Sequence, residues 1–172
     1  MPISTRVLPV DPEEPDSTAL DEAAAVLNRG GLVAFATETV YGLGAVATDA
    51  AAVARIFAAK GRPAVNPLIV HVVDVDQARQ CLADWPPDAD ALASRFWPGP
   101  LTIVLPRSGR IPAVVTAGKP TVGVRCPAGK VARGIIARCG HPIAAPSANR
   151  SNRLSPTRAA EASGVGRAAR AG

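Results

Sequence analysis

The chain has 172 residues, 19 of them Lys or Arg and 14 of them Asp or Glu, which gives a formal net charge of +5 at pH 7. With 48% apolar and 19% charged residues, the composition is globular and excludes a wholly disordered chain. Only 3% of the residues are aromatic, which argues against a nucleic-acid module that stacks bases on aromatic rings.

Strands and helices alternate along the predicted chain. In order, we expect a strand over residues 5–10, a helix over 17–29 capped by Ser17, a strand over 32–36, a helix capped by Thr48 or Asp49 and ended by Gly61, and a strand over 67–73. Helices over 76–82 and 88–96, strands over 101–105 and 121–125, a helix over 131–138 and a strand over 142–145 follow. The apolar runs are typical of strands buried on both faces.

This alternation predicts an α/β fold, with a twisted mixed sheet flanked by helices in a single domain over residues 1–172. The sheet is expected to be mixed because the connection from Leu105 to Thr121 has little helical content. The core is expected to span about residues 17–157. Residues 158–172 are rich in Ala, Gly and Arg and predict a frayed tail.

The start of the chain and its cysteines indicate the compartment. The first thirty residues carry several acidic side chains and no long apolar run, so we expect no secretory signal, no membrane contact and a cytoplasmic location. Cys81, Cys126 and Cys139 are odd in number and match no metal or redox spacing. We interpret them as reduced thiols that fill the interior.

The first polar motif is Thr37-Glu38-Thr39-Val40-Tyr41-Gly42-Leu43-Gly44, which follows directly on a predicted buried strand. Ligands of open α/β sheets bind outside the carboxyl ends of the strands, so a pocket is expected here. The alternative is a tight turn with solvated Thr and Glu side chains.

The second motif combines Lys60 and Arg62 with His71 at the end of the next strand. An ammonium and a planar guanidinium both suit phosphate oxygens, and both are expected to lie beyond the apolar face of the helix. Cations at a helix C-terminus are also favoured by the helix dipole, which is a purely structural alternative. His71 by itself would be read as a buried histidine with satisfied hydrogen bonds.

The third motif comprises residues 144–149 with Ser151 and Ser155. A strand that ends in Pro, Ser and Asn offers hydroxyl, amide and backbone N–H groups that could bind phosphate or ribose, although the same residues also suit an ordinary loop. Walker, Rossmann and zinc patterns are absent from the sequence, and Ser147 lacks the GxSxG context of a nucleophile.

Together these segments resemble the YrdC family of threonylcarbamoyl-AMP synthases. The resemblance is carried by residues 37–44, Phe57 with 60–63, 66–71, 97–102, 121–125, and 145–149 with 155–157. It implies a YrdC-like twisted α/β fold with an open basic cavity. It also implies a nucleotidyltransferase that converts L-threonine, bicarbonate and ATP into threonylcarbamoyl-AMP and pyrophosphate, for threonylcarbamoyladenosine modification of tRNA.

The resemblance also implies the site residues. The ATP site would comprise Lys60, Arg62, Asn66, Thr121, Ser147, Asn149 and Ser155, with Lys60 and Arg62 as the catalytic residues that hold the triphosphate. The threonine site would comprise Thr39, His71, Arg125 and the backbone at Ala145, with Arg125 opposite the carboxylate. Mg²⁺ would be bound through the phosphates, with no metal ligands from protein side chains. Downstream partners would be the tRNA threonylcarbamoyl-transfer machinery and tRNA or double-stranded RNA.

The chain departs from the family pattern at four places. Ala36 stands where Pro is usual, Asn152 where Gly is usual, and Gly129-Lys130 where His-Pro is usual. Family members continue beyond the Ser-Pro-Thr segment into a helix and a strand that carry a further Ser and Arg, whereas this chain ends at Gly172. We therefore expect weakened activity.

Two other functions remain open at this point. The first is a double-stranded RNA or tRNA-binding protein that uses the same basic cavity without catalysis. The second is a carbamoyl-transfer domain of the hydrogenase maturation type, although such domains sit in much longer chains with segments that this sequence lacks.

Overall fold

Helices and strands alternate as expected in the computed structural model, which describes residues 5–61, 63–149, 154–155, 157–158 and 162. The helices are α1 (Ser17–Asn28), α2 (Ala50–Lys60), α3 (Val75–Cys81), α4 (Pro87–Phe96), α5 (Ala113–Thr116) and α6 (Lys130–Cys139). The strands are β1 (Val33–Ala36), β2 (Tyr41–Val46), β3 (Ile69–His71), β4 (Ile103–Pro106), β5 (Thr121–Arg125) and β6 (Ile143–Ala144).

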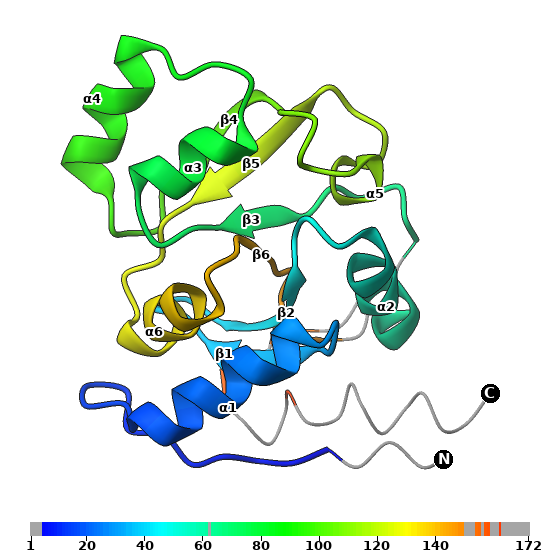
Figure 1. Ribbon diagram of the computed structural model, residues 1–172, viewed down its shortest axis with the longest axis vertical. Helices are drawn as coiled ribbons and strands as arrows, with labels where there is room; N and C mark the ends of the chain where they lie inside the picture. The colour runs from blue at the N-terminus through cyan, green and yellow to red at the C-terminus, as the bar shows by residue number, and fades with distance from the viewer. Residues whose placement is uncertain (1–4, 62, 150–153, 156, 159–161, 163–172) are drawn as a thin grey trace.

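Within the described residues, these six strands form one sheet in the order β1-β2-β6-β3-β5-β4 (Figure 1). β3 and β5 run parallel, while β1 with β2, β2 with β6, β6 with β3, and β4 with β5 run antiparallel. The sheet is therefore mixed, as predicted. The expected reason also holds, because the connection between β4 and β5 joins two antiparallel neighbours and needs no long helical crossover.

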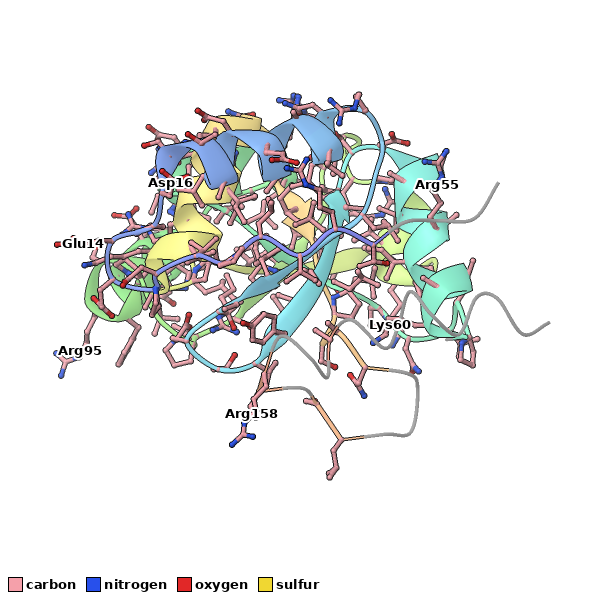
Figure 2. All side chains as sticks on the ribbon, turned by 90° about the horizontal axis from the view of Figure 1, so that it is seen from below. Glu14, Asp16, Arg55, Lys60, Arg95 and Arg158 are labelled. Carbon is pink, nitrogen blue, oxygen red and sulfur yellow. The ribbon has the colours of Figure 1, made fainter. Side chains whose placement is uncertain are left out.

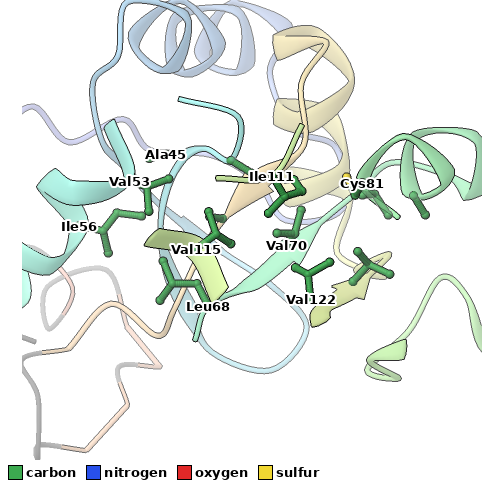
Figure 3. Packing of buried hydrophobic residues seen from close by; sticks show 14 of the residues in the cluster. Ala45, Val53, Ile56, Leu68, Val70, Cys81, Ile111, Val115 and Val122 are labelled. Atoms are coloured by element: carbon green, nitrogen blue, oxygen red, sulfur yellow. The ribbon is translucent and has the colours of Figure 1, made fainter. Parts of the chain in front are cut away.

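The sheet carries a hydrophobic core on each face. On one face, α1 and α6 pack on each other and on β1, and this core includes Phe35 and Ile143. On the other face, α2, α3 and α5 contribute to a larger core that includes Ala144, shown in close-up in Figure 3. Because side chains alternate along a strand, Ile143 and Ala144 of β6 supply one core each.

Close packing on the first face constrains β2. A Cβ atom placed on Gly44 would lie 2.6 Å from Cε1 of Phe35 and 2.8 Å from Cγ2 of Ile143, so a side chain does not fit at this position without movement. The glycine lets the side chains of Phe35 and Ile143 pack directly against the backbone of β2.

Hydrogen bonds fix the starts and ends of the main helices. The Asp49 carboxylate accepts from the backbone N–H groups of Ala51 and Ala52 at 3.0 Å, and Gly61 ends α2 with a φ of 58°. The cap of α1 is Asp16, whose side chain accepts from the N–H of Ala19, and not Ser17 as predicted. A carboxylate one residue earlier reaches the free donors of the first turn.

Two predictions about elements are wrong. Residues 5–10 form no strand and pair with no strand of the described residues. Pro9 has no backbone N–H to donate to a neighbouring strand. Arg6 instead forms an ion pair with Glu22 of α1. β2 occupies a segment predicted as a loop. The four-residue α5 lies in the connection predicted to have little helical content, which agrees with that prediction. Most of the predicted tail, 158–172, lies outside the described residues, and the single-domain organisation stays a prediction.

A helix needs about 20 consecutive apolar residues to span a bilayer, and the described helices are shorter than this. None of them is both long and apolar enough to cross a bilayer.

Substituting Gly44 with Ala should destabilise the fold. We expect Gly44→Ala to lower the free energy of unfolding by about 1–3 kcal/mol, because the methyl group overpacks the contact between Phe35 and Ile143. Urea denaturation measures this change. Gly109→Ala is the matched control, since a Cβ atom at Gly109 meets nothing within 4 Å. Equal stability of both variants would contradict the packing described for β2.

Candidate active site

A cavity of about 250 Å³ opens at the carboxyl ends of β3 and β5. It is lined by Thr37, Thr39, Val40, Gly42, Pro67, Leu68, Ile69, His71, Arg125, Ala145, Pro146 and Ser147. The four residues predicted to bind threonine, Thr39, His71, Arg125 and Ala145, are all in this lining. The structure therefore brings together four positions that lie up to 106 residues apart in the sequence.

Strand register explains why these side chains meet. His71 and Arg125 are the last residues of the parallel neighbours β3 and β5, and they are paired in the ladder. His71 also pairs with Ile143 of β6, so its side chain lies on the face that carries α1 and α6. Ala145, two residues beyond Ile143, shares that face. The cavity thus lies on the face of α1 and α6, where the parallel strands end.

Arg125 is buried, and oxygen atoms surround its guanidinium. Its Nη2 donates to Oε1 of Glu38 in a close ion pair, and its Nε donates to the carbonyl oxygen of Gly99 at 3.2 Å. Its Nη1 lies 3.5 Å from Oγ1 of Thr39. The side chain is only 10% exposed, so the positive charge is largely shielded from bulk water and is neutralised locally by Glu38.

The carboxylate of Glu38 is also held by the backbone of a second segment. Its Oε2 accepts from the N–H groups of Ala128 at 3.0 Å and Gly129 at 3.3 Å. Burial by itself would raise the pKa of Glu38, but its own backbone N–H, the Arg125 guanidinium and the N–H of Gly129 together lower it below the usual 4.5. The carboxylate is therefore ionised at neutral pH.

His71 presents a neutral imidazole to the cavity. Burial, and after it the positive charge of Arg125, lowers the pKa of His71 from 6.5 to about 4. Its Nδ1 is buried and has no hydrogen-bond partner among the described residues. The expectation that this histidine is internally satisfied is therefore wrong for Nδ1. A buried ring nitrogen without a partner beside a cavity is suited to a ligand that supplies one.

The turn between β1 and β2 is stabilised by threonine hydroxyls. Oγ1 of Thr37 donates to the carbonyl oxygen of Val40 at 2.7 Å and accepts from the N–H groups of Thr39 and Val40 at 3.2 Å. Oγ1 of Thr39 lies 3.0 Å from Oγ1 of Thr37. The segment is thus a tight turn, and it also lines the cavity. The pocket expected at this motif is present, whereas the alternative of solvated side chains is wrong for Glu38, whose carboxylate is paired with Arg125.

Lys60 lies in the last turn of α2 and is 2% exposed (Figure 2). Its ammonium donates to the carbonyl oxygen of Ser147 in a close contact and to that of Asn149 at 2.5 Å. The expectation that this side chain lies beyond the buried part of the helix is therefore wrong. The ammonium fixes the loop after β6, within which the hydroxyl of Ser147 donates to the side-chain oxygen of Asn149.

Among the described residues, Asn66, Thr121 and Ser155, also predicted to bind ATP, are not in the lining of this cavity. Thr121 is half-buried at the start of β5, at the opposite end of that strand from Arg125. Asn66 and Ser155 are exposed. Arg62 and Asn152 lie outside the described residues. Of the predicted nucleotide residues, the structure brings together Lys60, Ser147 and Asn149, and their roles in ATP binding stay predictions.

Two groups of the site were missed at the level of sequence. Glu38 was noted only as part of a polar motif, and the Gly99 carbonyl was not considered. A carboxylate between two threonines that line a pocket could have been paired with the one arginine predicted to face the ligand. Nothing in the local pattern around Gly99 identifies its carbonyl as an acceptor, because that contact depends on the fold of the 97–102 segment.

The three cysteines are free and buried, as predicted. Burial raises the pKa of Cys81 to about 11, and it also raises the pKa values of Cys126 and Cys139. Their thiols are therefore protonated at neutral pH and unsuited to nucleophilic catalysis.

A buried guanidinium next to a neutral imidazole and threonine hydroxyls makes this α/β protein suited to a small ligand with a carboxylate. Comparison with known sequences identifies the family. Residues 25–167 match the Sua5/YciO/YrdC family model, described as telomere recombination. The match covers most of the chain, so the chain belongs to this family, and the resemblance inferred from its motifs is confirmed.

Relatives and solved structures agree with this membership. The chain is 56% identical over 137 residues to the threonylcarbamoyl-AMP synthase of Pyrococcus abyssi and 50% identical over 139 residues to that of Bacillus subtilis, covering 80% of this chain and 40% of the relative in each case. A crystal structure of P. abyssi Sua5 complexed with L-threonine superposes with a TM-score of 0.86 at 50% identity, covering 88% of this chain and 44% of that one. The chain thus spans about 40% of the length of these two curated relatives.

The low pKa of His71 predicts a pH-dependent stability. Because the folded pKa of about 4 lies below the unfolded value near 6.5, the unfolded chain binds more protons in this window, and stability falls as pH decreases from 7 to 4. His71 should account for about 3 kcal/mol of that loss. We expect His71→Gln to lose less stability than the wild type between pH 7 and pH 4, by this amount, in urea denaturation.

The exposed His141 provides the matched control, and His141→Gln should follow the wild type over the same pH range. An identical loss of stability in His71→Gln and the wild type would show that folding does not lower the pKa of His71.

Proposed function

We propose that this chain forms threonylcarbamoyl-AMP from L-threonine, bicarbonate and ATP, with release of pyrophosphate. The observation that carries the proposal is the convergence of Thr39, His71, Arg125 and Ala145 on one cavity. These are the four positions at which the family resemblance implies threonine binding. Membership of the family and the names of the relatives support the same reaction. We also propose that residues 1–172 act as one YrdC-like domain.

The chemistry of the cavity suits a free amino acid. The buried Arg125 would bind the carboxylate, since a charge-assisted hydrogen bond is strongest where water is excluded. The hydroxyl of Thr39, 3.5 Å from Nη1 of Arg125, would contact the same end of the ligand. The free Nδ1 of His71 accepts a hydrogen bond in the neutral ring when the proton is on Nε2, so it could accept one from the threonine hydroxyl.

The nucleotide would lie beside Lys60 and the loop after β6. Lys60, Ser147 and Asn149 already contact one another there, and phosphate oxygens would join or replace the two backbone carbonyls around the ammonium. We propose Lys60 and Arg62 as the residues that neutralise the triphosphate, and Asn66, Thr121 and Ser155 as further nucleotide contacts. Mg²⁺ would be carried on the phosphate oxygens, which are ligands that it prefers.

The reaction needs positioning more than covalent help from the protein. The threonine amine attacks the carbon of bicarbonate, and loss of water leaves a carbamate. A carbamate oxygen then attacks the α-phosphorus of ATP, and the bond to the β-phosphate breaks to release pyrophosphate. Cations that stabilise the charge on the phosphates, and a cavity that holds the amino acid in place, supply the main catalytic effects.

The product would be consumed outside this chain. A mixed anhydride of a carbamate and AMP is an activated acyl group, and we propose that the tRNA threonylcarbamoyl-transfer machinery accepts it in the cytoplasm. Direct contact with tRNA or double-stranded RNA would be a further property of that handover. The net charge of +5 is compatible with such contact.

Release of pyrophosphate tests the reaction. We expect pyrophosphate to form from ATP when L-threonine and bicarbonate are both present, and we expect omission of either one to stop it. L-Valine in place of L-threonine is the matched control, because it keeps the branched shape and lacks the hydroxyl. Tight binding of RNA without any release of pyrophosphate would contradict the proposal and favour a binding protein.

Loss of the guanidinium should affect threonine far more than ATP. We expect Arg125→Leu to raise the Kd for L-threonine by roughly ten to two hundredfold, the range for one charge-assisted hydrogen bond, and to change the Kd for ATP by less than about threefold. Calorimetric titration with each ligand measures both values. Arg79→Leu is the control, since it removes an exposed guanidinium that pairs with Asp90. A selective loss of ATP affinity would show that Arg125 serves the nucleotide.

A further inference from the structure

Glu38 joins three segments that are distant in the sequence. It lies in the turn between β1 and β2, and one of its oxygens accepts from Arg125 at the end of β5. The other oxygen accepts from the N–H groups of Ala128 and Gly129 just before α6. The carboxylate therefore does more than neutralise a charge. It fixes the position of the guanidinium relative to two backbone segments.

The contacts of Arg125 leave Nη1 as the guanidinium nitrogen with the weakest protein contact. Nη2 is occupied by Glu38, and Nε is occupied by the Gly99 carbonyl at 3.2 Å. Among the contacts of the described residues, Nη1 has only the long contact of 3.5 Å to Thr39. Both Thr39 and Arg125 line the cavity, so Nη1 is the guanidinium nitrogen best placed for an anionic ligand.

An arginine side chain has many rotamers, and fixing one of them costs conformational entropy. When the guanidinium is already fixed in the free protein, ligand binding does not have to supply this entropy cost. Two charge-assisted contacts and a side chain that is 10% exposed hold Arg125 in one place. The side chain of Glu38 is itself 24% exposed, so the pair sits at the edge of the cavity wall and not deep in the core.

We propose that Glu38 is a positioning residue that aligns Arg125, so that Nη1 meets the carboxylate of the amino acid. This role rests on the proposed function. It assigns to Glu38 no contact with the substrate and no proton transfer. Two other roles would leave different signatures: a Glu38 carboxylate that competes with the ligand for the guanidinium, and one that only stabilises the turn.

The first measurement concerns Arg125 without any ligand. In a ¹H–¹⁵N spectrum, we expect the Nε–H signal of Arg125, assigned by its loss in Arg125→Leu, to be sharp and protected from solvent exchange in the wild type. We expect it to broaden or disappear in Glu38→Gln, which keeps the size of the side chain and removes its charge. The control is Glu13→Gln, which breaks the exposed pair with Lys130. An unchanged Arg125 signal in Glu38→Gln would overturn the proposal.

The second measurement concerns ligand binding. We expect Glu38→Gln to raise the Kd for L-threonine by about tenfold and to leave the Kd for ATP within about twofold, because the misaligned guanidinium loses one charge-assisted contact. Tighter binding of L-threonine by Glu38→Gln would show that the carboxylate competes with the ligand. Equal weakening for both ligands would show a general effect on the fold. Either result would overturn the proposal.

Coupling to Arg125 separates positioning from a structural role. If Glu38 acts through the guanidinium, adding Glu38→Gln to Arg125→Leu should weaken L-threonine binding by less than about twofold beyond Arg125→Leu alone. If the effects of Glu38→Gln and Arg125→Leu on L-threonine binding add fully, Glu38 does not act through Arg125. Should the wild type show the protected Arg125 signal but bind no L-threonine, the proposed function would fail while the alignment of Arg125 by Glu38 would stand.

Discussion

The structure depends on how the positive charge of a guanidinium is compensated at the end of a buried strand. Arg125 follows directly on the apolar residue Val124, and its charge would be costly there without compensation. Glu38 and the Gly99 carbonyl supply that compensation, which ties the β1–β2 turn and the 97–102 segment to β5. The same charge helps to keep His71 neutral. One buried cation thus organises both the shape of the cavity and the protonation state of its lining.

Secondary structure could be predicted from the sequence where apolar runs and helix caps are unambiguous. The alternation of strands and helices, the mixed sheet and the Asp49 cap of α2 follow from local pattern alone. β2 was missed because glycines are unfavourable in isolated strands, and only packing against Phe35 and Ile143 explains why Gly44 is required there. Residues 5–10 have the composition of a strand, but a strand exists only when a partner accepts it.

For the site, the residues that line the cavity could be predicted, but the partners that hold them could not. The lining residues Thr39, His71, Arg125 and Ala145 were identified through the family resemblance that the sequence motifs carry. The partners of these residues were not identified, because a hydrogen bond between positions 38 and 125 depends on the hairpin that local pattern did not predict. The burial of Lys60 was likewise hidden, as its carbonyl partners belong to a loop 87 and 89 residues away.

The two-residue strand β6 has a consequence for how the molecule opens. In the described sheet it is the strand that pairs with β2 on one side and with β3 on the other, and both of its residues are fully buried. Fluctuations that break this short ladder would divide the sheet into two halves and release Ala145 from the cavity wall. Local unfolding at β6 and access to the cavity are therefore coupled. A ligand that contacts both halves of the sheet would stabilise the closed state and disfavour this opening.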